Sequence, residues 1–226
     1  MIIAEIKSLD EIKDLISGYK KVLNTGCAGC TAVCLAGGQK EVESLNLKLS
    51  SAFKADNVPF EIDGFTVERQ CEVDFLAELD PLVDDYDALL SMACGAGIQF
   101  LAERFPHKPV FPAVNTTFIG VNKDVGWYEE RCKSCGDCVL GLTGGICPVT
   151  MCAKGLFNGP CGGPQNGSCE VNKDTPCAWI SIYERLKLQG RLENILKVYE
   201  AREWEDQIQG SMVLEQYKSR YVKKAE

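Results

Sequence analysis

The stretch Cys132-Lys-Ser-Cys-Gly-Asp-Cys138 places three cysteines at C-x2-C-x2-C spacing. A loop that offers three thiolates in so short a run can hold three corners of an iron–sulfur cubane, and ferredoxin-like sites add a later Cys-Pro cysteine. Cys147-Pro148 supplies such a cysteine. Structural zinc sites usually combine separated C-x2-C pairs, so a third cysteine at the same step exceeds what zinc requires. The spacing therefore favours iron–sulfur over zinc and indicates that metal binding decides how this segment folds.

Cysteine and glycine dominate the whole segment from about residue 126 to Cys177. It has too few apolar residues for an ordinary core, so its order is expected to come from bound metal, whose ligation free energy becomes folding free energy. Its thiolates match two four-ligand sites. The candidate ligands are Cys132, Cys135, Cys138, Cys147, Cys152, Cys161, Cys169 and Cys177.

The pairing of these cysteines with sites cannot be inferred from their spacing. Two 4Fe-4S clusters are the leading interpretation, and one cluster with one tetrahedral zinc is the alternative. In two-cluster ferredoxins the Cys-Pro cysteine ligates the other cluster, which makes Cys147 a candidate for crossing between sites.

Apolar strands alternate with amphipathic helices in the amino-terminal half. Strands are predicted over 20–25, 65–69, 88–93 and 110–114, and helices follow the Ser8-Leu-Asp-Glu11 capping box and cover 39–55, 72–85 and 98–105. This alternation predicts an α/β fold with a flavodoxin-like or Rossmann-like parallel sheet. Helices are also expected over 178–189, 192–204 and in the tail to 226. We therefore predict an α/β domain over 1–122, a cysteine-rich cluster module over 123–178 and carboxy-terminal helices over 179–226.

Cysteines follow three of the predicted strands, at the ends where parallel sheets form their sites. Cys27, Cys71 and Cys94 occupy these positions, and Cys30 and Cys34 follow Cys27 along the chain. One 4Fe-4S cluster needs four ligands, so one of the five thiols is spare, and the sequence leaves open whether it is Cys34 or Cys71.

Glycines lie next to these cysteines. Gly29, Gly95 and Gly97 are predicted to let backbone N–H groups approach the cluster, where hydrogen bonds to sulfur raise its reduction potential. Gly95-Ala-Gly97 also resembles the start of a dinucleotide-binding loop, but Phe100 occupies the position of its third glycine. No nucleotide site is predicted.

The composition excludes several function classes. The chain has 226 residues, 46% of them hydrophobic, and a net charge of −8, which repels nucleic acid and anionic lipid surfaces. We expect a cytoplasmic protein, because the first residues do not form a secretory signal and no apolar run approaches about 18 residues. Thiols stay reduced there, so the 13 cysteines are interpreted as ligands. No hydrolase, zinc-protease or Walker motif is present, so no catalytic residue is predicted.

Several longer stretches resemble known proteins. The carboxy-terminal ones are similar to the methylenetetrahydrofolate reductase C-terminal cysteine-rich domain, and they are Glu130–Cys138, Gly144–Gly155, Asn158–Gly163, Cys177–Trp179 and Tyr183–Leu186. The amino-terminal ones resemble the small iron–sulfur subunit that accompanies the catalytic subunit in acetogenic anaerobes, and they are Gly26–Cys34, Ala36–Val42, Arg69–Cys71 and Ala93–Gly97.

The resemblance implies a catalytic partner that carries FMN on a β/α barrel and reduces methylenetetrahydrofolate to methyltetrahydrofolate. The present chain would be a non-catalytic electron supply, fed by ferredoxin or another donor, with one 4Fe-4S cluster in its amino-terminal domain and one or two beyond it. A zinc label attached to this domain type keeps zinc open for one site. Two other hypotheses remain: a zinc-folded binding module of the same complex, and an electron relay like the hydrogenase small subunit, whose proximal-cluster domain has a similar C-A-G-C turn.

Overall fold

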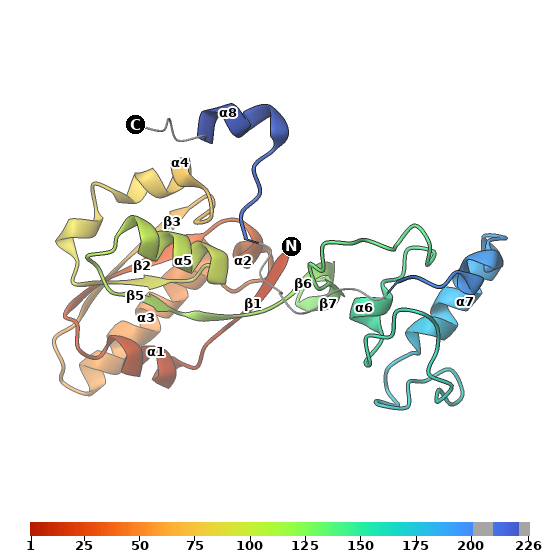
Figure 1. Cartoon of the computed structure of the whole chain (residues 1–226). Coiled ribbons are helices and arrows are strands. Elements are labelled where there is room, and N and C mark those ends of the chain that lie inside the picture. Colours follow the sequence, from red (N-terminus) through yellow and green to blue (C-terminus); the bar gives the residue numbers. More distant parts are fainter. Residues whose placement is uncertain (201–209, 222–226) are drawn as a thin grey trace. The chain divides into compact units, whose positions relative to one another are not determined.

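The computed structural model describes residues 1–200 and 210–221, and its contacts divide the chain into two units, Met1–Lys133 and Ser134–Glu226 (Figure 1). A four-stranded parallel sheet organises the first unit. Its strands, in the order β3-β2-β4-β5, are β3 (Glu61–Val67), β2 (Lys21–Cys27), β4 (Ala88–Ser91) and β5 (Val110–Pro112). With the helices described next, this sheet confirms the predicted α/β fold.

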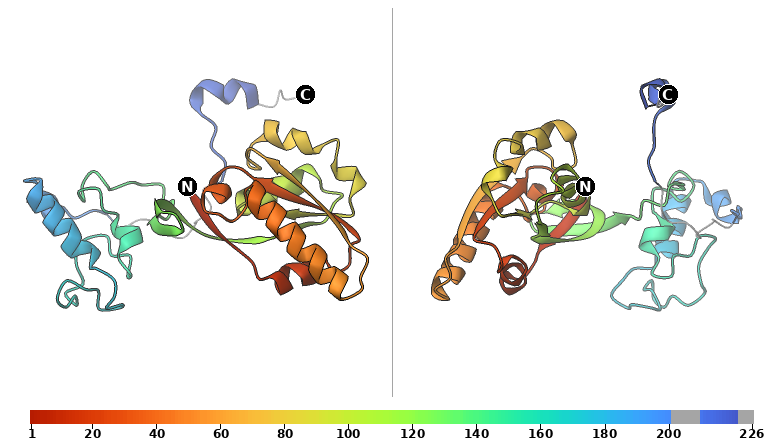
Figure 2. Two further views of the ribbon diagram at one scale, coloured as in Figure 1. Left: turned by 180° about the vertical axis from the view of Figure 1, so that it is seen from behind. Right: turned by 60° about the vertical axis from the view of Figure 1, so that its left-hand side comes forward.

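Helices cover both faces of this sheet (Figures 1 and 2). On one face lie α1 (Leu9–Ile16) and α3 (Gln39–Ala55), whose apolar residues pack in one core cluster with Val22 of β2. On the other face lies α5 (Gly95–Arg104), which packs in a second cluster with Leu23. Val22 and Leu23 face opposite sides because side chains alternate along a strand.

The predicted starts of two helices are confirmed. The hydroxyl of Ser8 accepts a hydrogen bond from the Glu11 N–H at 3.2 Å, as expected of a capping box, and α3 has the predicted bounds. A short helix that was not predicted, α2 (Cys30–Val33), follows β2.

The single helix predicted over 72–85 is wrong. The structure has α4 (Val73–Leu76) and two 3-10 turns, η1 (Ala77–Leu79) and η2 (Val83–Asp85). Pro81 interrupts the segment because it has no N–H to donate and its ring obstructs the preceding turn. The apolar spacing nevertheless identified buried residues, since Leu76, Leu79 and Val83 are all in the core.

A second, antiparallel sheet in the first unit was not predicted. It pairs β1 (Ile2–Ile6) with β6 (Val114–Asp124) and β6 with β7 (Trp127–Cys132). The strand predicted over 110–114 is divided, because β5 ends at Pro112 and Val114 already begins β6. Most of β6 is exposed or half-buried, so it lacks the apolar run by which buried strands are recognised.

The second unit has little regular structure. Its elements are α6 (Pro148–Met151), α7 (Ala178–Leu188), η3 (Leu192–Leu196), η4 (Glu215–Tyr217) and α8 (Lys218–Tyr221). The helix predicted over 178–189 is confirmed. The helix predicted over 192–204 is wrong for residues 192–200, where only η3 forms. Its last four residues lie outside the described part of the chain. Residues 205–209 and 222–226 of the predicted tail helix also lie outside it. The buried apolar cluster here consists of Trp179, Ile182 and Leu186.

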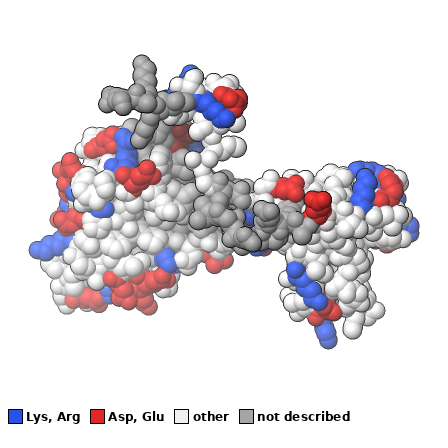
Figure 3. Space-filling view, viewed as in Figure 1, with Lys and Arg blue, Asp and Glu red and all other residues white. Residues whose placement is uncertain are grey.

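The division at residues 122 and 178 predicted from composition stays a prediction. In the described residues no helix is long and apolar enough to cross a bilayer. Lys and Arg side chains are interspersed with Asp and Glu on the face of the first unit visible in Figure 3.

Two leucines of α3 test the core of the first unit. We expect Leu49→Ala to lower the free energy of unfolding by about 2–5 kcal/mol, because the fully buried side chain leaves a cavity. Leu47→Ala is the matched control, since Leu47 is 72% exposed, and should cost less than about 0.5 kcal/mol. Urea denaturation followed by circular dichroism measures both. Equal effects would contradict the packing of α3 described above.

Candidate metal centres

Three neighbouring strands of the parallel sheet bring thiols to one edge. β2 ends at Cys27, Cys71 follows β3, and Cys94 follows β4. Because the strands are parallel and adjacent in the order β3-β2-β4, their carboxyl ends lie along the same edge. Cys30 joins them from the first residue of α2. We call Cys27, Cys30, Cys71 and Cys94 the strand-end set.

Electrostatics shows that these thiols are close to one another. Burial raises the pKa of the Cys71 thiol, and the neighbouring Cys27, Cys94 and Cys30 raise it further. All four are free thiols, with Cys27 buried, Cys30 and Cys94 half-buried and Cys71 exposed. The set therefore reaches from the end of the sheet to the surface of the first unit.

The side chain of Gln70 holds these strand ends together. It is fully buried, and its amide Nε2 donates hydrogen bonds to the carbonyl oxygens of Thr25 (2.8 Å) and Gly26 (3.0 Å) at the end of β2. Its Oε1 accepts from the Ser91 hydroxyl at the end of β4, at 2.7 Å. One amide thus connects two strand ends from the position directly before Cys71.

Gly97 allows helix α5 to approach this point. A Cβ atom at Gly97 would lie 2.9 Å from the Cβ of Ala93 and 3.0 Å from that of Gln70, closer than carbon atoms pack. Close packing, rather than backbone conformation, therefore requires glycine here. A Cβ at Gly29 would lie 3.5 Å from the sulfur of Cys27, so the Gly29 backbone adjoins the strand-end set. The Gly95 N–H donates to the Thr116 hydroxyl at 2.8 Å.

Cys34 has a different environment from the strand-end set. It is 6% exposed and packs in the core cluster that includes residues of α1 and α3. Its thiol donates to the carbonyl oxygens of Thr31 (3.5 Å) and Ala4 (3.6 Å), and burial raises its pKa. Cys34 behaves here as a small buried hydrophobe.

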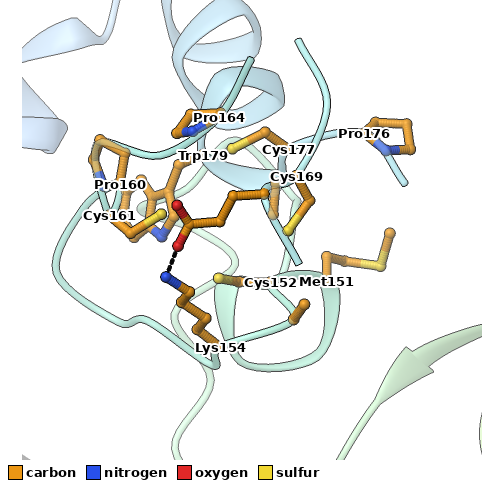
Figure 4. A pocket seen from close by; sticks show the side chains of 13 residues that line it. Met151, Cys152, Lys154, Pro160, Cys161, Pro164, Cys169, Pro176, Cys177 and Trp179 are labelled. Atoms are coloured by element: carbon orange, nitrogen blue, oxygen red, sulfur yellow. Dashed lines mark ion pairs between the residues drawn. The ribbon is translucent and has the colours of Figure 1, made fainter. Parts of the chain in front are cut away.

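A second group of thiols lines one pocket in the second unit (Figure 4). We call Cys152, Cys161, Cys169 and Cys177 the pocket set. Lys154 and Glu170 also line this pocket and form an ion pair there. Trp179 also lines the pocket, and its indole N–H donates to the Leu156 carbonyl at 2.9 Å.

The remaining cysteines lie outside this pocket lining. Cys132 is the last residue of β7, and Cys135 and Cys138 follow in the loop that begins the second unit. Cys147 precedes the first residue of α6, where Pro148 occupies the first helical position.

The sequence comparisons bear on the carboxy-terminal part of the chain. Residues 111–205 match the family model for the methylene-tetrahydrofolate reductase C terminal. The match covers less than half of the chain and links this part of it to methylenetetrahydrofolate reductase, as the resemblance predicted. It does not include the strand-end set, so the predicted resemblance of the amino-terminal half to an iron–sulfur subunit stays a prediction. Searches of curated proteins and of solved structures gave no match.

The chemistry of both sets fits a metal centre that prefers sulfur. Each set supplies four cysteines, the number that a cubane cluster or a tetrahedral zinc requires. Within residues 1–200 and 210–221, however, no three His, Cys, Asp or Glu side chains are arranged to hold a single ion. The thiols of the strand-end set meet along one edge of the sheet, and those of the pocket set line one pocket.

Sequence reasoning missed the residues that support these thiols. Gln70 directly precedes Cys71, and a polar amide just beyond an apolar strand was the available signal. Lys154 and Glu170 each lie within two residues of a cysteine of the pocket set, but charged residues are common in loops and gave no comparable signal.

Gln70→Ala tests the connection between the strand ends. The change removes the acceptor of the buried Ser91 hydroxyl and one donor to each of the Thr25 and Gly26 carbonyl oxygens, of which Thr25 still accepts from the Met92 N–H. We therefore expect the free energy of unfolding of the first unit to fall by about 2–4 kcal/mol. Gln99→Ala is the matched control, because Gln99 is exposed on α5 and bonds only to its own helix at Gly95. Hydrogen exchange of the backbone amides of β2 and β4 measures the loss of stability at these two strands. Unchanged exchange in Gln70→Ala would rule out the connection.

Proposed function

We propose that this chain is an electron-transfer iron–sulfur subunit that serves a methylenetetrahydrofolate reductase. The observation that carries the proposal is the strand-end set, in which three adjacent parallel strands bring Cys27, Cys30, Cys71 and Cys94 to one edge. When bound, a 4Fe-4S cluster accepts and releases single electrons. The exposure of Cys71 supports such a role, because a carrier must exchange electrons with a donor and an acceptor at its surface.

The four cysteines of the strand-end set are the proposed ligands of the amino-terminal cluster. Cys34 is then the spare thiol, because its sulfur is engaged by the carbonyl oxygens of Ala4 and Thr31 within the core. Gly29 lies between Cys27 and Cys30, where a Cβ would be 3.2 Å from the Cγ of Arg69 and 3.5 Å from the sulfur of Cys27.

Arg69 lies beside the strand-end set, two positions before Cys71. Its Cγ would be 3.2 Å from a Cβ at Gly29, and its guanidinium lies over the Phe75 ring at 5.1 Å. The same guanidinium forms an ion pair with Glu68 at 3.5 Å, and this carboxylate offsets the effect of the arginine charge on the reduction potential of a cluster.

The family match supports the choice of partner. It places the cysteine-rich part of this chain among methylenetetrahydrofolate reductase C-terminal sequences, and the sequence itself contains no familiar flavin, nucleotide or acid–base motif. The catalytic partner is therefore proposed to be a flavin-bearing reductase subunit. The reaction consumes two electrons, so a one-electron carrier would deliver them to FMN in two steps, and ferredoxin is the proposed donor class.

Metal analysis of anaerobically purified full-length protein tests the proposal. We expect iron and acid-labile sulfide in equal amounts, about four of each per cluster, and a brown colour that bleaches on reduction. Mixing the reduced protein with the flavoprotein partner should reduce the flavin. A folded protein that contains zinc alone would instead establish a zinc-folded binding module, and a folded protein with neither metal would exclude both functions.

Cys71→Ser and Cys34→Ala distinguish a ligand from a core cysteine. We expect Cys71→Ser to lose about four iron atoms, because the cluster loses a ligand at the strand edge. Cys34→Ala should keep its full iron content and lose only about 1–2 kcal/mol of stability, because Cys34 contributes to packing. Iron analysis and electron paramagnetic resonance of the reduced proteins measure the difference. The opposite pattern would make Cys34 the ligand and Cys71 the spare thiol.

A further inference from the structure

We infer that Cys152, Cys161, Cys169 and Cys177 bind one metal centre of their own, and that Cys147 is not among its ligands. The inference goes beyond the proposed function, because it concerns which cysteines share a metal and holds for either an iron–sulfur cluster or zinc. In two-cluster ferredoxins the Cys-Pro cysteine ligates the other cluster, which would make Cys147 a ligand of this centre. The inference excludes that role for Cys147.

The convergence of the pocket set is the first observation. Four of the cysteines in the second unit line a single pocket, although they are spread over the loops between residues 152 and 177 (Figure 4). A four-thiolate site needs no further protein ligand, whether the centre is a cubane or a tetrahedral ion.

Local backbone structure explains how the loops bring these thiols together. The N–H of Cys169 donates to the Thr175 carbonyl at 2.8 Å and that of Cys177 to the Gly167 carbonyl at 2.9 Å, so the two cysteines lie on paired backbone segments. Cys152 directly follows α6 and begins a tight turn in which the Gly155 N–H donates to the Cys152 carbonyl at 2.8 Å. Gly155 has a φ of 60°, which glycine adopts without strain.

One member of the pocket set lies at the amino end of a helix. Cys177 precedes α7, an eleven-residue helix whose amino-terminal N–H groups favour negative charge. This position favours ligation, because metal binding requires deprotonated thiols.

Cys147 has a position distinct from this set. It precedes α6, whereas Cys152 follows it, so a full helical turn separates the two. Cys147 is not among the residues that line the pocket. The pocket set also supplies all four ligands by itself, which leaves no coordination position for a fifth thiol.

Thiol labelling of the wild-type, full-length protein tests this grouping without any substitution. Anaerobic protein is treated with increasing chelator, the exposed thiols are alkylated, and mass spectrometry quantifies each cysteine. We expect Cys152, Cys161, Cys169 and Cys177 to become reactive together, in one step that Cys147 does not share. A step in which Cys147 accompanies them, or four unrelated time courses, would overturn the inference. The metal released in that step identifies the centre as iron–sulfur or zinc.

Metal content of variants gives an independent measurement. Cys161→Ser and Cys138→Ser should each lose one centre, and their combination should lose two, because Cys138 lies outside the pocket set. Combining Cys161→Ser with Cys147→Ser should lose the metal that Cys161→Ser loses plus whatever Cys147→Ser loses by itself, whereas equal losses in all three would place Cys147 in the pocket centre. Zinc at the pocket set without iron anywhere would refute the electron-transfer function and leave this inference intact.

Discussion

The hydrogen bonds of the Gln70 amide are the interaction on which the first unit depends at its functional edge. Parallel pairing alone brings the ends of β3, β2 and β4 into line, but it does not fix the loops that follow them. Gln70 does so by donating hydrogen bonds to carbonyl oxygens at the end of β2 and accepting one from a hydroxyl on β4, while Gly97 lets α5 pack against it. A buried amide with all its hydrogen bonds satisfied specifies one arrangement of its neighbours. The fixed strand ends in turn fix the positions of Cys27, Cys71 and Cys94.

The two units achieve order by different means. The first has apolar clusters on both faces of a sheet, which account for its order without a ligand. The second has a small cluster around Trp179, Ile182 and Leu186, and its loops depend on glycine turns and a few backbone hydrogen bonds. Bound metal at the pocket set would add the cross-links that such a segment lacks.

Much of the first unit could be predicted from its sequence because local signals agreed with the final packing. The apolar stripe of α3 gave its bounds, and the capping box at Ser8 gave the start of α1. The failures have physical causes. Pro81 divided a helix whose apolar spacing was otherwise correct, and β6 is too exposed to show a buried strand pattern. The pairing of β1 with β6 joins residues more than a hundred positions apart, for which no local signal exists.

The meeting of three cysteines at one strand edge could be predicted, and the grouping of the later cysteines could not. Cysteines at strand ends could be expected to meet, because parallel strands share an edge. The sequence could not show whether Cys34 or Cys71 is the spare thiol. Only tertiary packing distinguishes them, because Cys34 lies in the core and Cys71 is exposed at the sheet edge. The grouping of the later cysteines depends on turns such as that at Gly155. The spacing of cysteines along the chain does not show how such turns bring separate loops together.

The strand-end set also has a consequence for the order of events during biosynthesis. Its thiols are distributed from Cys27 to Cys94, and they become neighbours only after three strands have paired across long loops. The pocket set is contained within residues 152–177, so its members are neighbours along a short piece of chain before any sheet exists. A cluster proposed for the first site would therefore be inserted only after the nascent sheet has formed, whereas a metal proposed for the second could bind as soon as residues 152–177 have been synthesised.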